Sequence, residues 1–256
     1  MDALIVAGGT PAPTDPLYPD CRGRPKSLLD VGGRPMVQWV LDAVAGSARI
    51  DRILVVGLGK EDGLQSSKPL LYLAEQGSLI GNLRAGMAYA SSHDPSADHL
   101  LMATSDIPLI TSEMVGFRAD QIQQAGADLD YCAIERSIMQ ARFPDSRRSY
   151  IHLKDIEACG GDIHGVRLAL NWDDALWDRL IAARKNALKQ AYLLGLDTAL
   201  MLLLRQASVP WAEEKISRRL HLRARVQVCP YAEVGMDVDK PFQLQIVRRE
   251  IQALTR

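Results

Sequence analysis

The chain has 256 residues, of which 47% are hydrophobic and 24% are charged, and its formal net charge is −1 at pH 7. This composition supports a buried core and excludes a disordered chain, and the near-zero charge excludes the basic field that recruits nucleic acid. No apolar stretch reaches the roughly 20 residues that span a bilayer, and residues 1–9 lack the basic flank of a signal peptide. We therefore expect a cytoplasmic protein that neither inserts into membranes nor binds nucleic acid.

The first half of the chain alternates strand and helix patterns. Continuous apolar runs that end in glycine or polar residues predict buried strands, and apolar residues at helical spacing predict the helices between them. Strands are predicted over 3–9, 50–59, 69–75 and 97–108, and helices over 35–47, 79–92 and 112–126. Ser112 is the expected N-cap of the last helix, and Gly126 its end. This alternation predicts a mostly parallel sheet with helices on both faces and ligands at the carboxyl ends of its strands.

The pattern changes after Ala127. Residues 128–137 and 148–163 resemble strands with short turns, which suggests a hairpin. A long helical stretch is predicted over 172–206, and residues 225–251 predict a strand, a polar turn and a closing helix. The apolar side chains of the helical stretch suit a core, a homodimer contact or an apolar acceptor pocket. We expect one α/β domain with an inserted hairpin and helical segment.

The four cysteines stand far apart and form no C-x-x-C pair. This spacing argues against a zinc site, and scattered cysteines are typical of a reducing compartment.

A glycine turn and a lysine mark the end of the first strand. The N–H groups of Gly8 and Gly9 are suited to hold phosphate oxygens, because glycine lets a ligand approach the backbone closely. Arg22, Arg24 and Lys26 place three cations within five residues, which indicates a local anion site in a neutral protein. The alternative is a tight turn followed by a solvated basic loop. Neither G-x-x-x-x-G-K-[ST] nor G-x-G-x-x-G is present.

The string LIVAGG…RPKSLLDVGGRPMVQWVLDAV resembles the N-terminal signature of nucleotidyltransferases with the GT-A-like fold. These include sugar-phosphate nucleotidylyltransferases, molybdenum cofactor guanylyltransferases and the cytidylyltransferases of isoprenoid synthesis. The residues that match in order are Ala7, Gly8, Gly9, Pro25, Lys26, Leu28, Gly33, Arg34, Pro35 and Met36.

One departure from the family pattern concerns the triphosphate. The family continues G-x-G-x-R, whereas here Pro11 stands at the second glycine and no arginine precedes Arg22. Either Arg22 or Arg24 replaces the missing cation, or triphosphate binding is weakened.

The resemblance implies a Rossmann-like, three-layer fold in a single domain of residues 1–256. Its parts would be a nucleotide-binding half at 1–130, an acceptor-side elaboration at 131–215, and a closing strand, metal turn and helix at 216–256. Lys26 and Asp106 would be catalytic. The expected nucleotide-binding residues are Ala7, Gly8, Gly9, Arg22, Arg24, Gly77, Ser78 and Asn82, and the expected acceptor-binding residues are Glu135, Gly160 and Gly161. For Ser78, a helix N-cap is an equally good interpretation.

The resemblance also implies a Mg²⁺ (or Mn²⁺) site. Asp106 follows a strand, and the pattern DVDKPFQL places the second ligand at Asp239, with Asp237 as the alternate. Mg²⁺ usually takes one or two carboxylates plus substrate phosphates. In an extended turn these two aspartates would point apart, so only one should face the ion.

The expected activity is Mg²⁺-dependent transfer of a nucleoside monophosphate from a nucleoside triphosphate to a small phosphorylated or hydroxylated acceptor, with release of pyrophosphate. One alternative is a glycosyltransferase of the same fold that uses Asp237 and Asp239 as a D-x-D metal site. A non-catalytic nucleotide-binding protein is the other. The base and the acceptor stay open.

Overall fold

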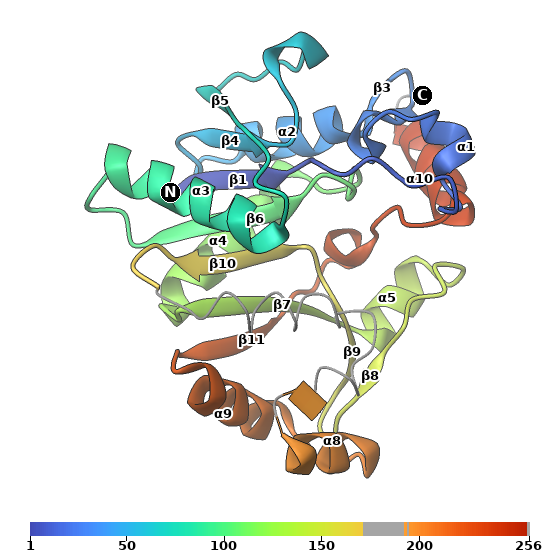
Figure 1. The fold of residues 1–256 in the computed structure, drawn as a ribbon. Coiled ribbons are helices and arrows are strands. Elements are labelled where there is room, and N and C mark those ends of the chain that lie inside the picture. The colour runs from blue at the N-terminus through green and yellow to red at the C-terminus, as the bar shows by residue number, and fades with distance from the viewer. Residues whose placement is uncertain (171–191, 194, 255–256) are drawn as a thin grey trace.

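The computed structural model describes residues 1–170, 192–193 and 195–254. In this part of the chain a nine-stranded sheet forms the middle of the molecule (Figure 1), in the order β5-β4-β1-β6-β10-β7-β9-β8, with β11 paired to β7. The strands are β1 (Asp2–Val6), β4 (Ile53–Val56), β5 (Leu70–Leu73), β6 (His99–Thr104), β7 (Leu129–Glu135), β8 (Ile151–His152), β9 (Glu157–Gly160), β10 (Ile163–Arg167) and β11 (Ala224–Val228). A small ribbon pairs β2 (Asp30–Val31) with β3 (Arg34–Pro35).

The sheet is mostly parallel, which confirms the predicted fold class. β1 runs parallel to β4 and β6, and β7 runs parallel to β11. β10 lies antiparallel between β6 and β7, and the hairpin β8–β9 is antiparallel as well. The expected pairing of 128–137 with 148–163 is found between β7 and β9, but the sequence did not predict that the second segment folds into the β8–β9 hairpin or that β10 enters the centre of the sheet.

The helices are α1 (Tyr18–Cys21), α2 (Met36–Gly46), α3 (Leu79–His93), α4 (Ser112–Ala125), α5 (Arg136–Arg142), α8 (Leu196–Leu203), α9 (Val209–Leu220) and α10 (Pro241–Leu254), with 3₁₀ turns at Lys26–Leu28, Lys60–Asp62 and Ala232–Gly235. Within the described ranges, no helix is both long enough and apolar enough to serve as a membrane span. Most of the predicted helix over 172–206 lies outside the described residues, and α8 falls within its last part. α5 and α9 were not predicted.

The expected N-cap of α4 was wrong by one residue. Thr111, not Ser112, has extended backbone, and its Oγ1 accepts a hydrogen bond from the N–H of Met114 at 3.4 Å. The helix ends as expected at Gly126, whose φ of 53° is in the left-handed region.

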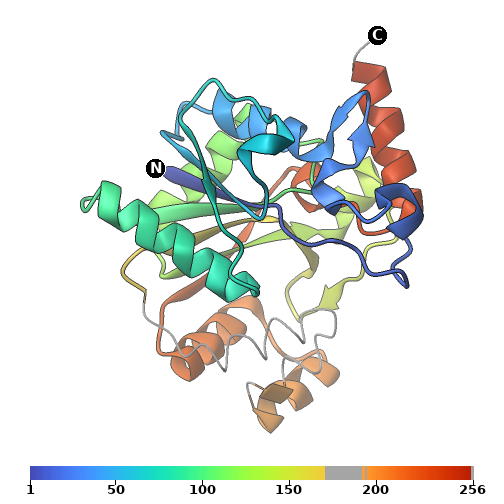
Figure 2. The same ribbon diagram turned by 45° about the horizontal axis from the view of Figure 1, so that its top comes forward.

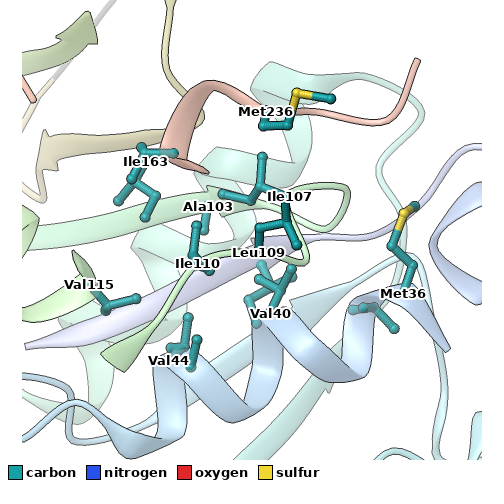
Figure 3. Close-up of a cluster of buried hydrophobic side chains, with 14 of the residues drawn as sticks. Met36, Val40, Val44, Ala103, Ile107, Leu109, Ile110, Val115, Ile163 and Met236 are labelled. Atoms are coloured by element: carbon teal, nitrogen blue, oxygen red, sulfur yellow. The ribbon is translucent and has the colours of Figure 1, made fainter. Parts of the chain in front are cut away.

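The alternation of side chains along each strand divides the core between the two faces of the sheet. Ala3 and Ile5 pack with α2, α4 and α10, whereas Leu4 packs with α3 on the other face. Figure 3 shows part of the first face, where α2 meets the end of β6 and the segment that follows it. Because both faces are covered, the carboxyl ends of β1 and β6 remain the open edge for a site.

A bulge separates β9 from β10. The chain advances five residues from Gly160 to Gly165, but only three along the partner strand from Ala133 to Asp130. Bulges of this kind bend a strand and re-aim the side chains in it. The Nε of Arg118, on α4, donates to the carbonyl of Ile163 at 3.2 Å, so a fully buried guanidinium holds this bend.

Candidate active site

The glycine turn and the lysine are joined by backbone contacts. The Lys26 N–H donates to the carbonyl of Gly9 at 3.2 Å, and the Ser27 hydroxyl donates to the carbonyl of Ala7 at 2.9 Å. The loop between them is anchored by the buried side chains of Leu17 and Cys21 and passes beside α10 (Figures 1 and 2). A long exposed loop therefore returns the chain to the point where the first strand ends.

This turn is shaped by two residues that the sequence analysis did not identify. A Cβ on Gly57 would lie 2.2 Å from the Cα of Gly8, so only glycine lets the end of β4 approach so closely. The carboxylate of Glu75, in the loop after β5, also lies against Gly8. A Cβ on Gly8 would be only 2.9 Å from the Oε1 of Glu75. The first contact could have been suspected from VVGLG, which also ends a strand in glycine.

Lys26 joins two aspartates that are far apart in the sequence. Its Nζ donates to Oδ2 of Asp106 and, at 3.0 Å, to Oδ1 of Asp239. Asp106 follows β6, and Asp239 precedes α10. The Val238 N–H donates to the Asp106 carbonyl at 3.0 Å, which fixes the late turn against the early one. Burial alone would lower the pKa of Lys26, but the charges and hydrogen bonds of the two aspartates outweigh it and raise that pKa.

Asp162 is a third carboxylate at this site, and the sequence analysis missed it. It lies in the bulge before β10, where its N–H donates to Val234 at 2.9 Å and its carbonyl accepts from Thr104 at 3.1 Å. Burial, followed by the charge of Asp106, raises the pKa of Asp162 to about 7. The only available signal was an aspartate after the double glycine of CGGD. We call Lys26, Asp106, Asp162 and Asp239 the acidic centre.

The acidic centre fits a hard divalent cation. The Oδ1 of Asp106 and the Oδ2 of Asp162 are buried and lack a hydrogen-bond partner among the described residues. Such buried, unpaired carboxylate oxygens are unfavourable unless the group is protonated or a cation binds it. In the described ranges, however, no three Asp, Glu, His or Cys side chains could hold a metal by themselves. A Mg²⁺ here would therefore complete its shell with water and substrate phosphates.

Asp237 faces a different partner. Its carboxylate pairs with Arg148, whose Nη2 also donates to the carbonyl of Gly160 at 3.1 Å. Asp237 and Asp239 thus point to different cations, and Asp239 is the one that reaches Lys26.

Residues 3–175 match the model of the MobA-like NTP transferase domain. The chain belongs to this family. Among curated relatives, the bifunctional protein GlmU of Brucella anthropi is 26% identical over an alignment of 162 residues, which covers 56% of this chain and 35% of GlmU. The molybdenum cofactor guanylyltransferase of Shewanella piezotolerans is 26% identical over 129 residues, or 50% of this chain and 58% of that protein. The match therefore spans about a third of that GlmU.

Solved structures show the same fold. A hypothetical transferase from Thermus thermophilus is 34% identical, with a TM-score of 0.79 over 95% of this chain and 98% of that one. The CMP:2-keto-3-deoxy-manno-octonic acid synthetase complexed with CTP is 15% identical, with a TM-score of 0.57 over 99% and 100% of the two chains. The second likeness establishes the fold alone.

In this MobA-like domain the loop before α3 is held by its own side chains. The Oγ of Ser78 accepts from the Gly81 N–H at 3.0 Å, so Ser78 is an N-cap. The buried Asn82 accepts from the Gln76 N–H at 2.7 Å, and its carbonyl therefore shapes the loop. Gly77 supports the turn with a φ of 76°.

The remaining candidates are dispersed. Arg22 and Arg24 are exposed in the turn after α1, and neither guanidinium contacts an acidic side chain among the described residues. Glu135, at the end of β7, accepts from the Ser137 hydroxyl at 3.2 Å. Gly160 binds Arg148, and Gly161 packs so tightly that a Cβ would be 2.6 Å from the Sγ of Cys132.

Proposed function

We propose that this chain is a Mg²⁺-dependent nucleotidyltransferase, which transfers a nucleoside monophosphate from a nucleoside triphosphate to a small acceptor and releases pyrophosphate. The observation that carries this proposal is the bridge from Lys26 to Asp106 and Asp239, held at the glycine turn by the contact between Lys26 N–H and Gly9 carbonyl. One cation and two hard-oxygen ligands thus meet beside backbone that can accommodate phosphates.

The Nζ of Lys26 lies between the carboxylates of Asp106 and Asp239, which are the groups that would hold a divalent ion. An ammonium is a compact point charge on a flexible stem, so it can pass to another anion when one arrives. With substrate bound, Asp106 and Asp239 would hold Mg²⁺, and Lys26 would turn to an oxygen of the triphosphate. The bound ion would supply charge neutralisation for the phosphates.

The reaction requires little covalent chemistry from the protein. An acceptor oxygen forms a bond to the α-phosphorus, the bond from that phosphorus to the bridging oxygen of the β-phosphate breaks, and the electron pair leaves on pyrophosphate. A phosphate oxygen on the acceptor is already ionised and needs no general base. The contribution of Gly8, Gly9 and Lys26 is alignment and stabilisation of negative charge.

The glycosyltransferase alternative is less well supported by the geometry. It would use Asp237 and Asp239 together at one metal, yet Asp237 is neutralised by Arg148 and Asp239 by Lys26. Opening both ion pairs would be needed to bring the two carboxylates to the same ion.

The test is a substrate screen that follows pyrophosphate. The protein is incubated with each of the common nucleoside triphosphates, Mg²⁺ and a pool of phosphorylated metabolites, with matched samples in EDTA. Acceptor-dependent pyrophosphate that disappears in EDTA supports the proposal. Consumption of a nucleotide sugar without pyrophosphate would support a glycosyltransferase, and triphosphate binding without turnover would support a non-catalytic protein.

A further inference from the structure

A second charged region lies between α5 and the β8–β9 hairpin. It is a cavity of about 240 Å³, lined among others by Arg136, Arg147, Arg148, Tyr150, His152 and Glu157. We call the three arginines and their cavity the arginine pocket. Three guanidiniums share the lining with a single carboxylate, so the pocket is suited to an anion.

Most of these charges have partners that hold them in place. Glu157 accepts from Nη1 of Arg136 at 2.6 Å and lies 2.9 Å from Nδ1 of His152. Arg136 also stacks over Tyr150, 5.4 Å from the ring centroid. Arg148 is paired with Asp237. The pocket is thereby preorganised, which lowers the entropy that a ligand must lose on binding.

Arg147 differs from its two neighbours. It has no carboxylate partner among the described residues. Its guanidinium instead packs at 5.2 Å over the ring of Phe242, a residue of α10 that lines a neighbouring cavity together with Arg147, so it would turn away from this ring to bind an anion in the arginine pocket. Its backbone φ is 50°, in the left-handed region that disfavours a residue with a Cβ. The adjacent Ser146 is buried and its N–H is bound to the Phe143 carbonyl at 3.1 Å, so the fold fixes this conformation.

The arginine pocket and the acidic centre are neighbours but separate. Arg148 lines the pocket and binds Asp237, two residues before Asp239. Lys26, Asp106, Asp162 and Asp239 are not among the lining residues. An anion held in the pocket would therefore be bound by a different set of side chains from those of the acidic centre.

We propose that the arginine pocket binds a phosphate monoester on the acceptor, at a position remote from the attacking oxygen. This inference rests on the proposed nucleotidyl transfer and names its acceptor class: a small molecule with a second, non-reacting phosphate. Arg147 is the principal anchor, because its guanidinium has no carboxylate to displace. Arg136 and Arg148, each already paired with a carboxylate, supply further N–H donors around it.

The direct test uses inorganic phosphate as the probe and requires no turnover. Phosphate is titrated into the protein, with binding followed by calorimetry, for the wild type, Arg147→Gly and Arg219→Gln. Glycine accepts the backbone conformation at 147, so the first variant should fold. Arg219 is exposed on α9, and its replacement removes the same charge elsewhere. We expect the Kd to rise about tenfold or more in Arg147→Gly only, the loss typical of one charge-assisted hydrogen bond.

Two results of this titration would overturn the inference. Equal affinity in Arg147→Gly and Arg219→Gln would show that Arg147 does not bind phosphate. Displacement of the phosphate by a nucleoside triphosphate in the absence of acceptor would show that the pocket belongs to the nucleotide.

The same variants separate this inference from the proposed function. If acceptors are found, the wild type should show a lower KM for those with two phosphates than for matched acceptors with one, and Arg147→Gly should abolish that preference. A preference that survives in Arg147→Gly would refute the arginine pocket while nucleotidyl transfer stands. Arg147-dependent phosphate binding without any pyrophosphate release would support the arginine pocket and refute nucleotidyl transfer.

Discussion

The acidic centre and the arginine pocket are built with opposite charge on the two sides of the Arg148–Asp237 pair. In the acidic centre one ammonium faces three carboxylates, two of which keep a buried oxygen without a partner among the described residues. In the arginine pocket three guanidiniums share one carboxylate along the lining. The first region needs a cation and the second an anion. A substrate that brings both, as a metal-bound triphosphate with a phosphorylated acceptor does, would be oriented by charge alone.

The largest effect is expected when the ammonium of Lys26 or the carboxylate of Asp106 is removed from the acidic centre. We expect Lys26→Ala and Asp106→Ala each to lower the turnover rate by about two to three orders of magnitude, since each removes charge stabilisation in the transition state. Steady-state pyrophosphate release measures this. Near-normal turnover in either variant would refute the role given to that residue.

The structural support of the acidic centre can be tested through Arg118. Its guanidinium and the Asp130 carboxylate are both fully buried and paired, and its Nε also holds the bulge that carries Asp162. We expect Arg118→Met to lower the free energy of unfolding by about 3–5 kcal/mol, because it leaves Asp130 charged and unpaired. The double variant Arg118→Met, Asp130→Leu should recover part of that loss in denaturant titrations. Additive losses would show that the pair is not coupled.

The glycine turn offers a matched pair of substitutions. Alanine at Gly57 would place its Cβ 2.2 Å from Gly8, whereas alanine at Gly63 would meet nothing within 4 Å, and both positions have positive φ. Gly63→Ala should cost only the conformational penalty of about 1–2 kcal/mol. Gly57→Ala should cost more and should also weaken triphosphate binding. Equal melting temperatures in the two variants would contradict the close approach.

A smaller effect should appear in the pH dependence of stability. Burial, with the charge of Arg118, lowers the pKa of His164 on β10 to about 3, well below its ordinary value of 6.5. The unfolded chain therefore takes up a proton below pH 6.5 that the folded chain refuses, and stability falls as the pH falls. The expected loss from this group is at most about 1.4 kcal/mol per pH unit.

His164→Asn provides the control for that prediction. The Nδ1 of His164 accepts from the Cys132 N–H at 3.2 Å, and an asparagine can retain an acceptor there. The wild-type unfolding free energy minus that of the variant should decrease from neutral pH toward pH 5, because only the wild type loses stability through this group. A constant difference would show that His164 does not titrate as expected.

The sequence predicted what is encoded locally. Gly8, Gly9 and Lys26 could be recognised because a strand, a turn and a basic residue follow one another in one segment, and Asp106 because it ends a strand. Asp239 required the family pattern. By contrast, no local pattern identifies Asp162 or Gly57. Asp162 reaches the acidic centre only through the register of its strand, and Gly57 matters only because β4 ends close to Gly8.

The acceptor side was harder to predict for the same physical reason. In the sequence, the residues before β10 resemble the end of a hairpin. In the structure, β10 pairs with both β6 and β7, and this pairing places Asp162 beside Asp106. In the sequence, Arg136 and Arg148 could bind an anionic acceptor, but they are more simply explained as solvated charges. Their convergence on one cavity depends on how α5 packs against the hairpin, and this is tertiary information.

The most direct measurement is a crystal structure with Mn²⁺ and a non-hydrolysable nucleoside triphosphate. The account predicts anomalous density between Asp106 and Asp239, with Lys26 released from both carboxylates and in contact with the polyphosphate at Gly8 and Gly9. A structure in which the triphosphate is bound while Lys26 still bridges the two aspartates, and the metal lies elsewhere, would contradict it.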